Sequence, residues 1–249
     1  EHFKIKPDSI IMEDIAFAAQ YCKHQRRVFI CDGDALIVTQ KRLLNILMEI
    51  ENQLPWVTRV GIYANAKSLK TKTLDELKAL KNHGLGIVYM GLETGDDVTL
   101  KKINKGATAE DMIQMGRKAK EAEFKLSITV LLGIAGKTRS EIHARETGRV
   151  LSAIDPEYVG ALSLMLIPGT PLYQDYASGE FTLPEAFEML EELKNMIAAT
   201  NLSRGLFYAN HASNYLPIKA RLPKDKAATI KLIESALEGK IALTPEYMR

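Results

Sequence analysis

The stretch that decides the fold reads VYMGLETG and covers residues 88–95. An apolar run leads into Gly91, and the carboxylate of Glu93 stands between this glycine and Gly95. A second apolar run, residues 128–132, ends in the same way at Gly133. Glycine and polar residues at the end of an apolar strand are typical of a ligand-binding group at the carboxyl end of a parallel strand.

Five runs of apolar and β-branched residues recur along the chain, with helical patterns between them. They cover residues 27–32, 57–64, 86–92, 125–132 and 158–167. Strands that are apolar on both faces and alternate with helices favour a parallel sheet covered by helices. The chain is therefore expected to be an α/β protein whose sheet curves into a barrel or part of one.

Capping-box spacing, a threonine three residues before a glutamate, predicts where three helices begin. The pairs are Thr73 with Glu76, Thr138 with Glu141, and Thr182 with Glu185. Beyond the last run, further patterns predict a helix over 184–200, a strand and turn over 205–216, and a helix over 224–237. We therefore expect a barrel domain over residues 1–172 and a C-terminal α/β extension over 173–249.

The composition excludes several classes of protein. The chain has 249 residues, 46% hydrophobic and 26% charged, enough for one sizeable core, and its net charge of +2 does not indicate nucleic acid as a partner. No apolar run approaches the roughly 20 residues of a membrane-spanning helix. Cys22 and Cys31 are the only cysteines, too few for a disulfide framework or for an iron–sulfur cluster held by this chain, so a reduced, cytoplasmic protein is expected.

The runs at 88–95 and 128–133, with Asn104-Lys105-Gly106 between them, resemble the radical S-adenosylmethionine (SAM) superfamily. The resemblance is to the branch of elongator-type, tRNA-methylthiolating and oxygen-independent coproporphyrinogen oxidase enzymes. It implies a partial, open TIM-like (β/α)6 barrel that binds SAM and a [4Fe-4S] cluster. In this family a C-x-x-x-C-x-x-C loop holds the cluster, and no such loop occurs here, so the loop and the first strand are expected upstream of Glu1.

The resemblance also implies an activity. In the whole protein, an electron from a donor such as flavodoxin or ferredoxin would cleave SAM reductively to a 5'-deoxyadenosyl radical that acts on an unknown substrate. The chain by itself is expected to be inactive. Two alternatives stay open: a cluster-free barrel that binds SAM or a nucleotide, and an aldolase-like barrel with Lys67 or Lys105 as a Schiff-base amine.

Three strand-end positions match the family's contacts to the polar groups of SAM. Gly33 and Asp34 stand where relatives hold the amino group, Glu93 where they hold the ribose hydroxyls, and Lys105 where they hold the carboxylate. Each has a simpler alternative. Asp34 could cap the next helix, Glu93 could cap a helix over 96–103, and Lys105 could be a solvated surface lysine.

The remaining SAM contacts implied by the resemblance lie on the next two strands. Thr129 is expected near the ribose, Gly133 opens a loop expected against the adenine, and the main chain at Met165 and Leu166 is expected beside it. Thr129 could instead be a β-branched residue that simply suits its strand.

Four residues are candidates for contact with the substrate. Tyr63 and Asn65 follow the strand over 57–64, and His211 and Asn214 belong to a cluster of polar residues in the extension. The alternatives are an ordinary strand-to-helix loop for the first pair and a structural role for the histidine.

Overall fold

The computed structural model describes residues 4–245, and its chain forms two compact units. The first comprises the residues up to Met90 together with Arg117–Leu126, and the second comprises Gly91–Gly116 and the residues from Ser127 onward.

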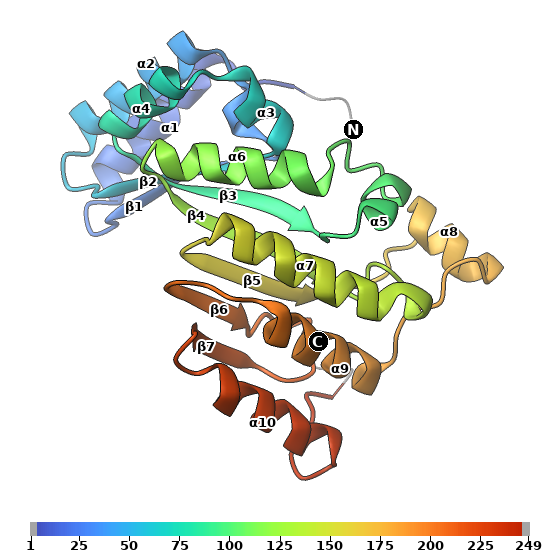
Figure 1. Cartoon of the computed structure of the whole chain (residues 1–249). Coiled ribbons are helices and arrows are strands. Elements are labelled where there is room, and N and C mark those ends of the chain that lie inside the picture. The colour runs from blue at the N-terminus through green and yellow to red at the C-terminus, as the bar shows by residue number, and fades with distance from the viewer. Residues whose placement is uncertain (1–3, 246–249) are drawn as a thin grey trace. The chain divides into compact units, whose positions relative to one another are not determined.

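The strands are β1 Arg27–Ile30, β2 Arg59–Ala64, β3 Leu85–Glu93, β4 Lys125–Leu132, β5 Tyr158–Ser163, β6 Gly205–Ala209 and β7 Ile218–Leu222 (Figure 1). In the first unit β1, β2 and β3 are parallel neighbours. In the second unit β4, β5 and β6 are parallel, and β7 returns antiparallel to β6. The strands predicted from the five apolar runs and the strand predicted within 205–216, which is β6, are confirmed, whereas β7 was not predicted.

The α-helices are α1 Asp8–Tyr21, α2 Gln40–Gln53, α3 Ala66–Thr71, α4 Leu74–Asn82, α5 Asp97–Lys102, α6 Ala109–Glu121, α7 Ser140–Ile154, α8 Pro171–Ser178, α9 Ala186–Ala199 and α10 Lys226–Leu237. Two short 3-10 turns, η1 Ala35–Ile37 and η2 Lys137–Arg139, precede α2 and α7. Helix α8 was not predicted. It begins at a proline, with the Thr170 hydroxyl accepting a hydrogen bond from the Tyr173 amide.

Of the three predicted capping boxes, the one at Thr73 is confirmed: the Thr73 hydroxyl accepts from the Glu76 amide, and the Glu76 carboxylate accepts from the Thr73 amide. The other two are wrong. Helix α7 begins after the 3-10 turn that contains Thr138. Thr182 lies in a segment without helix or strand, and its carbonyl accepts from the Lys137 amide. Helix α9 begins four residues later.

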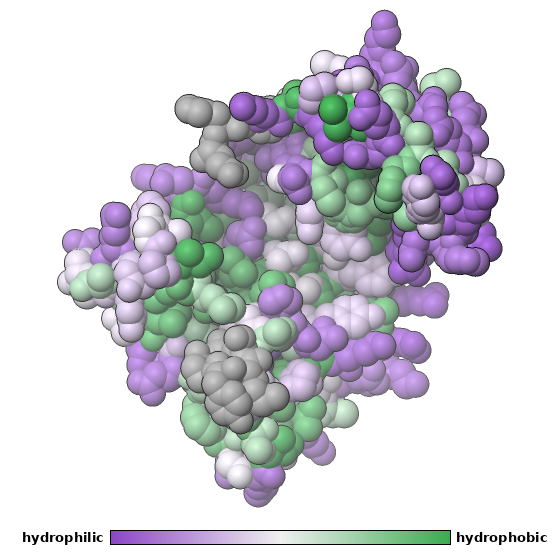
Figure 2. Space-filling view, turned by 180° about the vertical axis from the view of Figure 1, so that it is seen from behind, coloured by the Kyte–Doolittle hydropathy of each residue, from purple (hydrophilic) through white to green (hydrophobic). Residues whose placement is uncertain are grey.

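Each unit has its own apolar core. In the first, helix α2 packs against α1 and α4 and contributes Leu43 and Leu47 to the core. In the second, α7 packs on α9, and α9 on α10. Gly148 allows the first of these contacts, because a Cβ there would lie 2.5 Å from the Ala199 Cβ. Figure 2 shows many hydrophilic residues on the surface of the first unit, at the upper right.

Candidate functional site

The end of β3 in the second unit holds a paired carboxylate. Glu93 Oε1 accepts a hydrogen bond from Lys105 Nζ at 2.8 Å, and both side chains are 20% exposed. The pair lies over Gly91, where a Cβ would come within 2.2 Å of Glu93 Oε1. A side chain at position 91 would therefore displace the carboxylate, which explains why glycine precedes it.

Glu93 has a left-handed backbone conformation, with φ of 61°. This conformation costs a residue with a Cβ about 1 kcal/mol or more, and such residues cluster at ligand sites. The side chain does not cap the next helix. Asp96 does this instead, because its carboxylate accepts from the Thr99 amide at 3.2 Å and from the Thr99 hydroxyl at 2.6 Å. The capping alternative for Glu93 is thus wrong.

Asp96 also forms an ion pair with Arg139 through two hydrogen bonds. Its two oxygens accept from Arg139 Nε and Nη2, both at 2.8 Å, and its side chain is 6% exposed. Burial alone would raise the pKa of Asp96, but the hydrogen bonds from Arg139 and Thr99 and the charge of Arg139 lower it to about 2. The pair therefore joins α5 to the turn before α7.

The turn after β4 begins at Gly133, whose φ of 81° suits glycine. Its amide donates to Glu192 Oε1 at 2.6 Å, and a Cβ at Gly133 would lie 2.9 Å from Met189 Cε. Both partners come from α9, so this helix of the extension packs against the turn.

Alternation along β4 places Thr129 on the half-exposed face of the strand with Ser127, whereas Ile128 and Val130 are fully buried on the other face. Thr129 pairs with Gly160 of β5. Strand β5 ends at Ser163, four residues before the predicted end, so Met165 and Leu166 lie in the segment beyond it. Met165 is exposed and Leu166 is half-buried.

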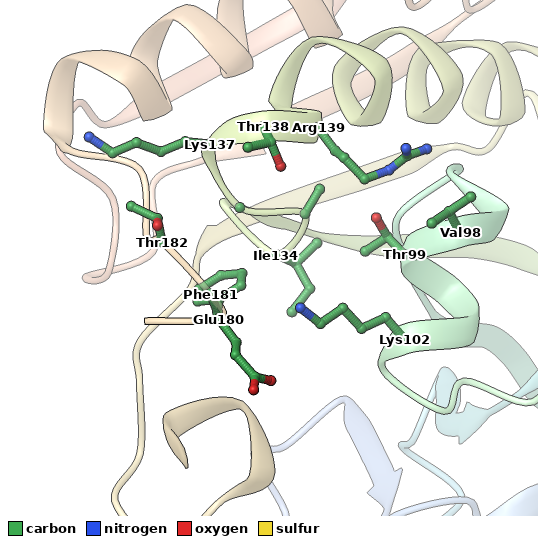
Figure 3. A pocket seen from close by; sticks show the side chains of 12 residues that line it. Val98, Thr99, Lys102, Ile134, Lys137, Thr138, Arg139, Glu180, Phe181 and Thr182 are labelled. Atoms are coloured by element: carbon green, nitrogen blue, oxygen red, sulfur yellow. The ribbon is translucent and has the colours of Figure 1, made fainter. Parts of the chain in front are cut away.

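A pocket of ≈ 130 Å³ lies between α5, the turn before α7 and the segment at residues 180–182. Figure 3 shows Lys102 reaching from α5 toward Ile134 and Phe181, while Lys137 points away from them. Lys102 Nζ lies 5.7 Å from the centre of the Phe181 ring. Because Arg139 and Lys137 are each paired with carboxylates, this pocket offers a ligand little uncompensated charge.

In the first unit, Gly33 and Asp34 follow β1 as predicted, but the Asp34 carboxylate is turned inward. Among the described residues, neither of its oxygens, both shielded from solvent, has a partner with good hydrogen-bond geometry. Burial raises the pKa of Asp34, against the opposing effects of Ser68, Asn65 and the Lys72 charge. Burial also lowers the pKa of Lys72, whose ammonium donates to the Val38 carbonyl at 2.7 Å.

The two substrate candidates of the first unit have different surroundings. Asn65 caps α3: its Oδ1 accepts from the Ser68 amide at 2.9 Å, and the Ser68 hydroxyl accepts from the Asn65 amide at 3.1 Å. Tyr63 is 46% exposed and packs edge-on against Phe29 and Tyr89, with ring centres 4.7 and 6.0 Å away. An exposed aromatic surface thus lies on β1, β2 and β3.

The two candidates of the extension differ, and only Asn214 bonds directly to β5. Asn214 is buried, its Oδ1 accepts from the Ser163 hydroxyl at 3.0 Å, and its amide donates to the Ala161 carbonyl at 2.9 Å. His211 is exposed, with Nδ1 2.9 Å from the Ser213 hydroxyl. This geometry gives Asn214 a structural role, while a substrate contact by His211 stays a prediction.

Sequence reasoning missed two buried polar residues, His143 on α7 and Glu192 on α9. Glu192 lies within the run EMLEELK, where it is adjacent to Glu191 and reads as a solvated helix face. A helical projection with Met189, Leu193 and Met196 would have placed Glu192 beside the apolar stripe.

Within residues 4–245, no group of three or more histidine, cysteine or acidic side chains comes together as a metal site. Cys22 is half-buried and Cys31 is exposed. In the same range, no helix is both long and apolar enough to span a membrane.

Comparison with solved structures shows the fold. Coproporphyrinogen III oxidase from Escherichia coli, described as a radical SAM enzyme, matches 76% of this chain and 44% of its own with a TM-score of 0.60 and 14% identity. Elp3 from Methanocaldococcus infernus matches 92% of this chain and 58% of its own with a TM-score of 0.58 and 15% identity. The expected α/β, open partial-barrel class is thereby confirmed.

Comparison with curated sequences finds relatives of 23% and 28% identity. The heme chaperone HemW of Bacillus subtilis is 23% identical over 160 residues, which are 64% of this chain and 42% of the relative. The uncharacterized protein MJ0486 of Methanocaldococcus jannaschii is 28% identical over 156 residues, 59% of this chain and 48% of the relative. The chain thus spans less than half the length of these relatives.

The profile of the Radical SAM superfamily matches residues 2–145, more than half of the chain. This range contains Glu93, Lys105, Thr129 and Gly133, the residues that the second unit brings to the ends of β3 and β4. The chain belongs to the radical SAM superfamily.

Proposed function

We propose that the second unit binds the nucleoside part of SAM at the ends of β3, β4 and β5, and that the whole protein is a radical SAM enzyme. The observation that carries this proposal is the Glu93 carboxylate, which is held by Lys105 over Gly91 in a left-handed backbone conformation. Membership of the superfamily supplies the chemistry: reductive cleavage of SAM to a 5'-deoxyadenosyl radical.

Glu93 suits the ribose of SAM. An ionised carboxylate accepts about four hydrogen bonds through its two oxygens, so the bond from Lys105 leaves acceptor capacity for a cis-diol. Hydrogen bonds to a charged group are also stronger than those between neutral groups. Lys105 orients the Glu93 carboxylate through their hydrogen bond, and its positive charge attracts the carboxylate of SAM.

The neighbouring strand ends would complete the nucleoside site. Thr129 contributes a hydroxyl on the half-exposed face of β4, and the turn at Gly133 offers main-chain groups to an adenine ring. The main chain at Met165 and Leu166 would flank the same ring. For the first unit, contact of Gly33 and Asp34 with the amino group stays a prediction, and Asp34 would have to turn its inward carboxylate toward the ligand.

The residues present do not form a cluster site, because the chain has two cysteines and a [4Fe-4S] cluster uses a set of three or four. We therefore assign the cluster ligands to polypeptide outside these residues and derive no step through the cluster. An electron donor such as flavodoxin or ferredoxin, and a reducing cytoplasm, belong to the same proposal. The alternative is a SAM or nucleotide-binding barrel without radical chemistry, which the cysteine count favours.

The test uses nucleosides, which need no cluster for binding. Adenosine and 2',3'-dideoxyadenosine differ in the ribose diol, so their affinity ratio, measured by calorimetry, reports the Glu93 contact. We expect the wild type to prefer adenosine by about 5- to 100-fold and Glu93→Ala to lose that preference, since the contact is worth about 1–3 kcal/mol. Alanine keeps a Cβ on the left-handed backbone, so the change isolates the carboxylate.

Two further variants sharpen the result. Gly91→Ala should also abolish the diol preference, because its Cβ would displace Glu93 Oε1, the end of a flexible side chain that can move without unfolding the protein. Glu191→Ala removes an exposed carboxylate paired with Lys194 at 2.6 Å and should leave the preference unchanged. Failure of wild type to bind adenosine at millimolar concentration, or an equal preference in wild type and Glu93→Ala, would contradict the proposal.

A further inference from the structure

A buried polar network in the second unit links the turn after β3 to the turn after β4. Its central residues are His143 on α7 and Glu192 on α9, which are 0% and 1% exposed. Thr94, directly after β3, and Thr147, one turn beyond His143, are also fully buried. All four therefore lie away from the solvent, although each is polar.

Glu192 holds the turn after β4. Its Oε1 accepts from the Gly133 amide at 2.6 Å, and its Oε2 accepts from the Ser140 hydroxyl at the start of α7. The two ends of the segment between β4 and α7 are thus bound to one carboxylate. Because hydrogen bonds to a charged acceptor are short and directional, this arrangement restricts the position of Gly133.

His143 extends the network to the turn after β3. Its Nε2 lies 3.3 Å from Glu192 Oε1, within ion-pair distance but without hydrogen-bond geometry, and its Nδ1 lies 2.7 Å from the Thr94 hydroxyl. The Thr94 hydroxyl oxygen in turn accepts from the Asp96 amide at 3.0 Å.

Thr147 fixes the same turn at a second point, because its hydroxyl accepts from the Gly95 amide at 2.9 Å. The residues on the carboxyl side of Glu93 are consequently held through α7. Position 93 can therefore keep its left-handed conformation while its side chain turns back over Gly91.

This network is more than an ordinary part of the core. The buried neighbours of Glu192 on α9 include Leu190 and Leu193, and an apolar residue in its place would avoid the cost of burying a charge. Buried ion pairs are weak stabilisers in comparison with apolar residues of similar size. What Glu192 provides, and a leucine would not, is a fixed geometry at two turns.

We propose that Glu192 is a positioning residue for the nucleoside site, which holds the Gly133 turn directly and the Glu93 turn through His143. The inference rests on the proposed function, since it concerns the same site. The inference also gives the C-terminal extension a role. Helix α9 lies beyond residues 2–145, the range of the superfamily match, and it would position the site without contacting the ligand.

The test compares Glu192→Leu and Glu192→Gln with Glu191→Leu and Glu191→Gln, exposed controls from the same helix. The first readout is the ratio of affinities for adenosine and 2',3'-dideoxyadenosine. A partly unfolded population lowers both affinities equally and leaves the ratio unchanged, so a merely structural effect does not alter it. The second readout is amide hydrogen exchange at residues 94–96 and 133–136 without ligand.

We expect Glu192→Leu to reduce the diol preference to that of Glu93→Ala and to accelerate exchange in both turns by about tenfold over the Glu191 control. Glu192→Gln should have an intermediate effect, because its amide brings donors to a site already lined by the donors of Gly133 and Ser140. Both Glu191 variants should match the wild type.

A wild-type ratio together with control-level exchange in folded Glu192→Leu overturns the proposal. If Glu192→Leu does not fold, Glu192→Gln decides by the same two readouts, and wild-type behaviour in both overturns it. If the wild type itself shows no diol preference, the proposed function fails. The exchange rates at the two turns then still decide whether Glu192 positions them.

Discussion

Replacing Gly95 by alanine should destabilise the protein, because this glycine lies against the backbone of α7. A Cβ at position 95 would lie 2.3 Å from the Glu146 carbonyl oxygen and 2.7 Å from the Thr147 amide nitrogen. Contacts this short require a backbone shift, and overpacking of this kind costs about 1–3 kcal/mol. The shift would also weaken the bond from the Gly95 amide to the Thr147 hydroxyl, worth about 1 kcal/mol.

The expected loss is therefore about 2–4 kcal/mol out of a total stability of about 5–15 kcal/mol. For a chain of this size it corresponds to a fall in melting temperature of about 4–16 °C. Thermal and urea unfolding followed by circular dichroism measure both quantities.

Gly160→Ala provides the matched control, because a Cβ there would have its nearest neighbour, Leu162 Cδ1, at 4.0 Å. This variant should be as stable as the wild type or slightly more so. Equal unfolding midpoints for Gly95→Ala and Gly160→Ala would refute the packing argument.

Two further predictions concern capping residues. Asp96 has a pKa lowered from 3.8 to about 2, so its stabilising effect is complete above about pH 4 and is lost as the pH falls toward 2. Urea unfolding at pH 5 and pH 3 should show that wild type loses about 1 kcal/mol more over this interval than Asp96→Asn, and equal losses would exclude the pair with Arg139 as the cause. Asn65→Ala should lower stability by about 1 kcal/mol by removing the cap of α3, while Asn65→Asp should retain it; equal stability of the two variants would contradict the capping role.

The strands and the ends that carry candidate ligand groups could be predicted from the sequence because their signals are local. Five apolar runs separated by helical patterns are enough for a parallel sheet, and Thr73 with Glu76 marks a helix start within four residues. Thr182 with Glu185 has the same spacing and no helix follows directly, because the Thr182 carbonyl is engaged by Lys137, forty-five positions earlier in the chain. Local spacing cannot reveal such a distant partner.

Side-chain direction was the least predictable part of the candidate site. Glu191 and Glu192 are indistinguishable by residue type, yet one forms an exposed ion pair and the other is buried under Gly133. Asp34 follows its strand as expected, but its carboxylate turns toward Ser68 and Lys72. The helical period separates the two glutamates, but the partners of Glu192 and of Asp34 are set by tertiary packing, which the local sequence does not specify.

At position 93 the left-handed backbone lowers the stability of the fold, whereas the carboxylate at the same position is the proposed ligand group. Glycine at 93 would relieve about 1 kcal/mol of conformational cost and would remove the carboxylate at the same time. A library of variants selected only for resistance to heat would therefore tend to accumulate glycine there and lose the ligand group. Enrichment of glycine at position 93 under thermal selection, and its depletion under selection for nucleoside binding, would show that the protein tolerates this cost for its ligand.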